Sequence, residues 1–335
     1  MNVNKKLFII IGTVLISLIL IILIIIVALG GRHEQQTIQF SMNNTTSNNI
    51  VQNNTFENET ENNVNNITNS TSEENTITGE ITYVETSDGG RIPVPPTFEY
   101  IEGDSSTGAI IKDANDNEFV WVPVNNSSDY QRQIFINNGD GITTEDIEEL
   151  NLNDATNQDY IDSIMNYKGF YVARYETGKE DETDTPVSKK GVIPWTMVVW
   201  EKAKDIATQM YTENDYFQTD LISSYAWDTV CNWMRNTGTN IDDSTNYGNY
   251  QNSIDGLNRV VETGSNERWK VNNIYDMAGN VWEYTTEEYG NHEKYHMGRG
   301  GGYWNYGNLY PISTRGTSED AADINIGFRI VMYLK

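Results

Sequence analysis

The chain has 335 residues, a net charge of −26 and a pI near 4.3. So acidic a surface repels phosphate backbones and anionic headgroups, which excludes nucleic acid as a partner. The single cysteine, Cys231, excludes an intrachain disulfide, and its apolar neighbours indicate a small buried residue.

Residues 7–29 form an apolar run without a charged residue. The run has 23 residues, more than the about 20 that cross a bilayer as a helix. Lys5 and Lys6 precede it, so we expect the amino terminus in the cytoplasm and the rest of the chain outside the cell. This pattern predicts a single-pass protein of the cell membrane with an extracytoplasmic C-terminal domain. A cleaved signal peptide is the alternative, although such peptides have apolar cores of only about 7–15 residues.

Residues 30–80 are rich in Asn, Thr, Ser and Glu and poor in aromatic residues. Such a segment buries too little apolar surface to offset the entropy of ordering, so it predicts a disordered stalk. Its Asn-X-Ser/Thr triplets are glycosylation acceptors only in a host with that machinery. All eight tryptophans follow residue 120, and we predict one folded domain over residues 81–335.

Two segments early in this domain have the composition of strands. The first is 118–124, where Pro123 indicates an edge strand or a strand end. The second is 170–175, which is rich in aromatic and β-branched residues.

Two helices are predicted next. After Val199, apolar residues recur at the spacing of one helical face, at Ala203, Ile206, Ala207 and Met210. The second helix is capped by Ser223 or Ser224 and stops at Gly238. Its buried face is predicted to comprise Trp227, Val230, Cys231 and Met234. Residues 236–256 show little periodicity and predict a long loop.

The segment 273–283 contains a turn signal, Gly279-Asn280, between two acidic residues. A turn there keeps Asp276 and Glu283 off one helix face and lets both carboxylates converge on one point. Carboxylate and main-chain oxygens on an irregular loop are the ligands that Ca²⁺ prefers. From these residues alone, the alternative is an aspartate that closes a turn and a glutamate in a surface ion pair.

The same segment, Asn273-Ile-Tyr-Asp-Met-Ala-Gly-Asn-Val-Trp-Glu283, resembles the signature of the formylglycine-generating, or sulfatase-modifying factor, family. Five further segments match that family's motifs in the same order, and together they cover about 160 residues: 169–176, 195–203, 223–227, 299–304 and 327–329. The resemblance implies a variant of the C-type lectin fold, and hence an α+β domain with irregular loops.

The resemblance also implies a structural calcium site. Its ligands would be the side chains of Asp276 and Glu283 and the main-chain carbonyls of Gly279 and Val281. Trp282 is expected to point the other way, into the core. Arg329 is expected to form a structural ion pair.

The chain lacks the residues that two catalytic chemistries of the superfamily require. In the oxidases a pair of cysteines binds copper, and the resemblance places those positions at Asn305 and Tyr310, which cannot supply thiolates. We therefore expect no copper. The iron-dependent branch needs several histidines, but His292 and His296 lie in a segment that predicts a polar loop and two solvated side chains.

The residues at and around the positions of the family's catalytic cysteines favour ligand binding. The run contains aromatic and amide side chains that give contact area and adaptable hydrogen bonds: Tyr303, Trp304, Asn305, Tyr306, Asn308 and Tyr310. The alternative is that half of them, Tyr303 and Trp304 first, belong to the core of a closing strand.

We therefore predict a membrane-anchored domain that binds an extracellular protein or glycan without being an enzyme. The main alternative is an enzyme of the same superfamily with unrecognised chemistry, and a third is a purely structural surface protein. A shallow aromatic patch near Asn305 favours binding, whereas a deep polar pocket with converging carboxylates favours catalysis.

Overall fold

The computed structural model describes residues 79–135, 152–154, 157–180, 183–212, 214–290, 295–319 and 321–335. All of them belong to the unit Thr71–Lys335. The predicted membrane span 7–29 and nearly all of the predicted stalk lie outside the described residues. Within the described part, no helix combines the length and the apolar character needed to cross a membrane.

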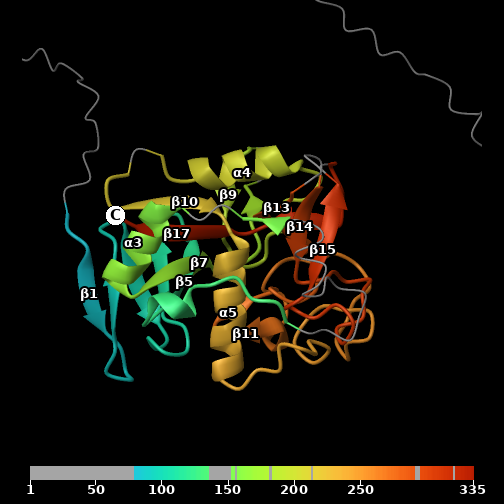
Figure 1. The fold of residues 1–335 in the computed structure, drawn as a ribbon, viewed down its shortest axis with the longest axis horizontal. Coiled ribbons are helices and arrows are strands. Elements are labelled where there is room, and N and C mark those ends of the chain that lie inside the picture. Colours follow the sequence, from blue (N-terminus) through green and yellow to red (C-terminus); the bar gives the residue numbers. More distant parts are fainter. Residues whose placement is uncertain are drawn as a thin grey trace, which may run out of the picture. The chain divides into compact units, whose positions relative to one another are not determined.

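A six-stranded antiparallel sheet forms the centre of the fold, with the order β10-β17-β7-β5-β4-β3 (Figure 1). Its strands are β3 (Phe98–Glu102), β4 (Ile110–Asp113), β5 (Glu118–Pro123), β7 (Gly169–Ala173), β10 (Phe217–Leu221) and β17 (Ile330–Leu334).

Strand β5 shows why this sheet is buried on both sides. Val120 and Val122 pack into one apolar cluster, whereas Phe119 and Trp121 pack into another, as the two-residue period of a strand requires. The strand predicted at 118–124 is confirmed. Pro123 marks its end, where it pairs with Gly169; the alternative of an edge strand is wrong, because β5 lies between β4 and β7.

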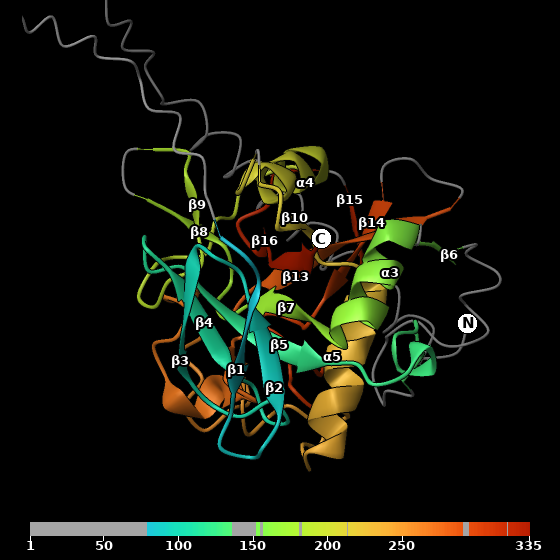
Figure 2. The same ribbon diagram turned by 90° about the vertical axis from the view of Figure 1, so that its left-hand side faces the viewer.

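Helices cover the two faces. α5 (Ser224–Asn236) and α3 (Gln158–Tyr167) contribute to the cluster on one face, and α4 (Trp200–Gln209) contributes to the other (Figure 2). Both predicted helices are confirmed. The Ser223 hydroxyl accepts a hydrogen bond from the Ala226 amide at 3.1 Å, so Ser223 is the cap of α5.

A second sheet has the order β15-β14-β13-β16, and β6 pairs with the far end of β13. Its strands are β6 (Leu152–Asn153), β13 (Trp282–Tyr289), β14 (Tyr295–Arg299), β15 (Arg315–Glu319) and β16 (Ile326–Phe328). β13 and β16 are parallel, and the other pairs are antiparallel.

The remaining elements are short. Three two-stranded sheets pair β1 (Thr82–Glu85) with β2 (Arg91–Val94), β8 (Gly178–Lys179) with β9 (Pro186–Val187), and β11 (Lys270–Val271) with β12 (Ile274–Tyr275). Two 3₁₀ turns are η1 (Ser127–Asp129) and η2 (Glu267–Trp269).

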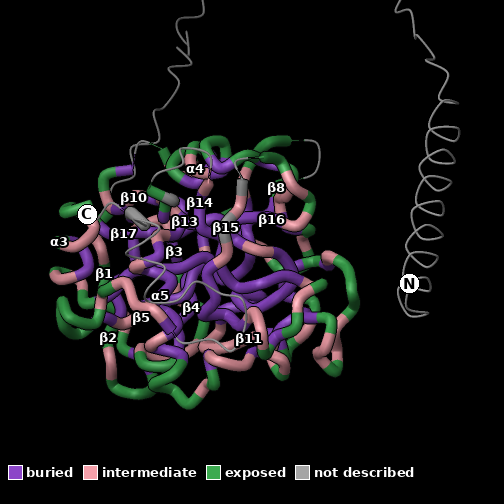
Figure 3. Tube along the Cα trace, turned by 45° about the vertical axis from the view of Figure 1, so that its right-hand side comes forward, coloured by how far each residue is buried: buried purple, intermediate pink, exposed green. Residues whose placement is uncertain are grey.

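Residues 237–266 contain no helix or strand, which confirms the predicted long loop. Parts of this loop, such as 248–250 and 263–264, are nevertheless buried, and the tube view shows buried chain beyond the sheets (Figure 3). Buried amides hold it in place: the Asn249 side chain donates to the Arg259 carbonyl at 3.0 Å and accepts from the Leu257 amide at 3.0 Å. Side-chain hydrogen bonds thus satisfy the backbone groups that a sheet would otherwise pair.

Candidate functional site

A groove of about 560 Å³ opens where four strands of the second sheet meet two loops. The strands are β13, β14, β15 and β16, and the loops are 303–310 and 321–325. The groove is lined by Trp282, Gly298, Trp304, Asn305, Tyr310, Arg315, Gly316, Ser318, Ala321, Ala322, Asp323, Asn325 and Ile326.

Trp282 is held in this groove by two glycines and one amide. A Cβ atom added to Gly316 would lie 2.8 Å from the Trp282 ring, and one added to Gly298 would lie 3.3 Å from it. The indole therefore rests on strand backbone that only glycine leaves open. Its Nε1–H donates to the Asn305 side-chain oxygen at 2.9 Å. Trp282 was expected in the core; it packs partly there, but its half-buried ring also lines the groove.

Asn305 organises the neighbouring turn. Its side-chain oxygen also accepts from the Gly302 amide at 2.9 Å, and its carbonyl accepts from the Gln251 amide at 2.9 Å. Two N–H donors, from Trp282 and Gly302, converge on one side-chain atom, so that atom is the amide oxygen. The Asn305 NH₂ group therefore points away from both donors.

The structure separates the six predicted ligand residues into two groups. Trp304, Asn305 and Tyr310 line the groove; Tyr303, Tyr306 and Asn308 are outside its lining. The alternative of a closing strand is wrong, because residues 303–310 form turns and Trp304 is 38% exposed.

Sequence reasoning missed the part of the groove that the loop 321–325 contributes. This loop has no periodicity and reaches the groove only because β15 and β16 flank it. The glycines at 298 and 316 were the one local signal, since a strand glycine often marks a close approach.

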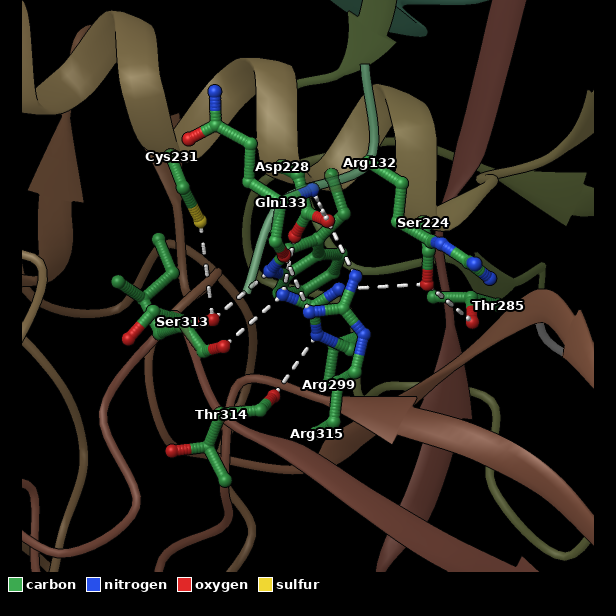
Figure 4. A network of polar contacts seen from close by, with 12 residues as sticks. Arg132, Gln133, Ser224, Asp228, Cys231, Thr285, Arg299, Ser313, Thr314 and Arg315 are labelled. Atoms are coloured by element: carbon green, nitrogen blue, oxygen red, sulfur yellow. Dashed lines mark hydrogen bonds and ion pairs between the residues drawn. The ribbon is translucent and has the colours of Figure 1, made fainter. Parts of the chain in front are cut away.

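A buried charge network lies beneath the groove (Figure 4). Arg315 donates through Nε to Glu287 at 2.8 Å and through Nη2 to Asp228. Asp228 also accepts from Arg299 at 2.7 Å. Burial by itself lowers the pKa of Arg315, but Asp228 and Glu287 outweigh it and the pKa is raised. Arg315 is thus charged and fully committed to protein partners, with Nη1 donating to the Gln133 carbonyl at 2.7 Å.

The predicted calcium residues lie at a separate place, in the turn before β13 and, for Glu283, at the start of that strand. Gly279 has φ +78° and Asn280 has φ +58°, which confirms the predicted turn. Both oxygens of Glu283 accept from Arg329, at 2.6 and 2.9 Å, and this buried ion pair confirms the expected role of Arg329. A surface ion pair for Glu283 is therefore wrong.

Asp276 carries an oxygen suited to a cation. One of its carboxylate oxygens accepts from the Gly264 amide at 2.7 Å and from the Thr263 hydroxyl at 2.9 Å. The other is buried and has no hydrogen-bond partner in the described part of the chain. Asp276 thus fits a calcium ligand, whereas Glu283 would have to share its oxygens with Arg329. The main-chain oxygens of Gly279 and Val281 sit on the same turn, and calcium binding stays a prediction.

Among the described residues, three buried carboxylates interact electrostatically with the guanidinium of Arg329, and one of them, Glu283, contacts it. Burial raises the pKa of Asp276 to about 6, and it also raises the pKa of Glu283. For Glu176, burial and then the charges of Asp276 and Glu283 raise the pKa well above its usual value. One cation thus faces more negative charge than it neutralises. A bound cation or bound protons would relieve this imbalance.

The histidine and cysteine predictions have different outcomes. His296 does not lie in a polar loop; it belongs to β14, is 5% exposed and stacks on Trp200 with 3.9 Å between ring centres. His292 lies outside the described residues. Cys231 is buried as predicted, and burial raises the pKa of its thiol to about 12. Among the described residues, no three His, Cys, Asp or Glu side chains are grouped to hold a metal.

A protein-family model described as the sulfatase-modifying factor enzyme 1-like domain matches residues 146–334, more than half of the chain. No curated protein matches. Matches among solved structures include the crystal structure of CarF, at 15% identity over 50% of this chain and 87% of that one, with a TM-score of 0.39. Treponema denticola variable protein 1 shares 12% identity over 71% and 99%, with a TM-score of 0.40. PvdO from Pseudomonas aeruginosa shares 14% identity over 67% and 98%, with a TM-score of 0.38.

Proposed function

The chain belongs to the family of sulfatase-modifying factor enzyme 1-like domains, and we propose that in this member the domain binds a ligand in the groove without oxidising it. One observation carries the proposal. Asn305 and Tyr310 occupy the positions that the resemblance gives to the copper-binding cysteines, and both line the groove. Asn305 is bound to Trp282 and Gly302, so it acts as a fixed part of an aromatic wall.

The only thiol of the chain supports this proposal. Cys231 is 0% exposed, and its raised pKa keeps it protonated at neutral pH. It contributes to the apolar cluster under α5 and is absent from the groove lining. A buried, protonated thiol cannot serve as a copper ligand or a nucleophile.

The groove has the composition of a recognition surface. Trp282, Trp304 and Tyr310 provide large, stiff contact area at low entropy cost, and amides beside them provide hydrogen bonds. Among the described lining residues, Asp323 is the single carboxylate, so no pair of carboxylates converges there for acid–base chemistry. This favours binding over an unrecognised catalytic chemistry.

We further propose that residues 7–29 anchor the chain in the cell membrane and that residues 30–80 hold the domain away from it. The ligand would then be an extracellular protein or glycan. A calcium ion at Asp276, with the Gly279 and Val281 carbonyls, would have a structural role, because the ion-binding turn precedes β13 and so helps to fix Trp282.

The experiment uses the purified full chain with millimolar Ca²⁺ on arrays of extracellular proteins, peptides and glycans. Binding that is lost in Trp304→Ala and kept in Tyr306→Ala supports the proposal. Tyr306 is the matched control, because it is an exposed aromatic residue on the same loop that does not line the groove. In parallel, a sulfatase-type cysteine peptide is incubated with the protein and copper. Turnover above a heat-killed sample, or the lack of any groove-dependent binding, contradicts the proposal.

A further inference from the structure

We propose that the groove selects a neutral ring rich in hydroxyl groups, which is the chemistry of a pyranose residue in an uncharged glycan. This inference rests on the proposed function and names its ligand class. It is carried by the flatness of the aromatic floor, by the orientation of one amide and by the absence of an available cation among the described lining residues.

The Trp282 indole offers the groove a flat apolar surface. The Trp282 ring is fixed by Gly298 and Gly316 beneath it and by the Asn305 oxygen at its Nε1, so it cannot rotate to meet a bulky side chain. Trp304 lines the same groove, and 38% of its surface is exposed. A pyranose presents C–H groups on its ring faces and hydroxyls around its rim. It therefore packs flat on such rings while its hydroxyls reach outward.

The polar groups around this floor suit hydroxyls. Because the Asn305 oxygen is occupied by two N–H donors, its NH₂ group is the part left to donate to a ligand. From the facing loop, Asp323 uses one carboxylate oxygen to accept from the Asn325 amide at 2.8 Å, which leaves acceptor capacity on the other. A hydroxyl both donates and accepts, so a sugar can satisfy the amide and the carboxylate together.

The charges of the groove disfavour an anion. Arg315 is the only cation in the described lining, and its guanidinium is committed to Glu287, Asp228 and the Gln133 carbonyl. A sulfate, phosphate or sialic acid carboxylate would therefore meet Asp323 without a free counter-charge.

Among its described residues, the lining also lacks a deep aliphatic socket for a peptide side chain. Its aliphatic members are Ala321, Ala322 and Ile326; the alanines are small, and Ile326 is 8% exposed. A polypeptide that binds tightly generally inserts an aromatic or aliphatic anchor into such a socket. The groove therefore favours a sugar over a peptide.

The test uses the full chain, purified in a detergent without a sugar headgroup, in millimolar Ca²⁺. The probes are uncharged oligosaccharides of glucose, galactose, mannose, N-acetylglucosamine and N-acetylgalactosamine. Each is printed beside its sulfated or sialylated form and beside a peptide panel. We expect binding to at least one uncharged oligosaccharide, and at least about tenfold weaker binding to its anionic form.

Two variants locate that binding. Trp304→Ala removes exposed ring surface, and Asn305→Asp keeps the oxygen that accepts from Trp282 and Gly302 but removes the NH₂ donor. Each is expected to weaken binding at least about tenfold, whereas Tyr306→Ala is expected to leave it unchanged. Thermal melts of the three variants check that the fold is kept.

The outcomes separate this inference from the proposed function. If a peptide or an anionic glycan binds and Trp304→Ala abolishes that binding, the sugar inference is overturned and the proposed function stands. If an uncharged glycan binds equally well to wild type and to both groove variants, the assigned site is wrong. If no probe binds, both the inference and the proposed function are contradicted.

Discussion

The substitution Asp276→Asn tests the argument that the Asp276 carboxylate, which is buried before β13, destabilises the fold when it is ionised. Asp276 is 1% exposed, and one of its oxygens has no partner in the described part of the chain. Asparagine has the same shape, so its oxygen can accept from Gly264 and Thr263 as the carboxylate does. The substitution therefore removes the buried charge and places the NH₂ group where the unpartnered oxygen lies.

The expected magnitude follows from the pKa. Burial raises the pKa of Asp276 from about 3.9 in the unfolded chain to about 6 in the fold. Because the folded-state pKa is the higher one, this group's contribution to stability is complete below about pH 4 and is lost as the pH rises through 6. Without calcium, ionised Asp276 costs about 1–3 kcal/mol at pH 7.5. Asp276→Asn should relieve that cost, with a rise in Tm of about 3–10 °C at pH 7.5 and a much smaller rise at pH 4.5.

Calcium should change which of the two proteins, wild type or Asp276→Asn, has the higher melting temperature. If the ion binds at Asp276, the wild type gains about 2.7 kcal/mol at a calcium concentration a hundredfold above Kd. An asparagine side chain lacks the charge that attracts the ion, so Asp276→Asn should gain far less. The exposed Asp215→Asn substitution is the matched control and should change neither the pH dependence nor the calcium response.

The assay is a thermal melt of the full chain in EDTA and in millimolar Ca²⁺, at pH 4.5 and pH 7.5. Burial also raises the pKa of Asp154 to about 6, so part of the pH dependence should persist in Asp276→Asn. If Asp276→Asn and wild type melt together at both pH values in EDTA, the argument from buried charge is refuted. If calcium leaves the wild-type Tm unchanged, the predicted calcium site is wrong.

Other parts of the chain give three further predictions. Arg329→Met should lower the free energy of unfolding by about 3–5 kcal/mol, because it leaves the buried Glu283 carboxylate without its cation. A denaturant titration measures this loss, and a loss below about 1 kcal/mol, the size of a surface ion pair, contradicts the prediction. The purified protein should not convert a sulfatase-type cysteine peptide to formylglycine, because Asn305 and Tyr310 supply no thiolate; copper-dependent product detected by mass spectrometry is the opposing result. Protease added to intact cells should release the folded domain, because residues 7–29 are predicted to anchor it from outside; recovery of the domain from cytosol, with none in the membrane fraction, opposes this topology.

Local patterns were enough for the elements whose stabilising contacts are local. The sequence predicts the buried face of α5 and narrows its cap to Ser223 or Ser224, because these serines and the apolar residues that follow define a helix within one short segment; the structure identifies Ser223. The segment 290–298 predicts a loop because a glycine stands at each of its ends, and nothing local shows that β14, most of which lies in this segment, pairs with β13 on one side and β15 on the other. Tertiary pairing made it a strand and buried His296.

The candidate site was predictable only in part for the same reason. Trp304, Asn305 and Tyr310 stand in one run, and the resemblance located that run. Residues 321–325 join the groove through the fold alone. Glu176 likewise joins Asp276 from a distant strand end, where its carboxylate accepts from the Asn280 amide group at 2.6 Å. No spacing in the sequence connects those positions.

The most direct test of the central claim is a ¹⁹F spectrum of the full chain labelled with 5-fluorotryptophan. Its eight tryptophans give resonances that single Trp→Phe substitutions assign. The labelled protein is titrated with the tightest-binding member of the arrays. Ligand binding in the groove predicts shifts of the Trp282 and Trp304 resonances, while that of Trp233, in the other apolar cluster, stays in place. Shifts confined to tryptophans outside the groove would contradict the claim that this groove is the binding site.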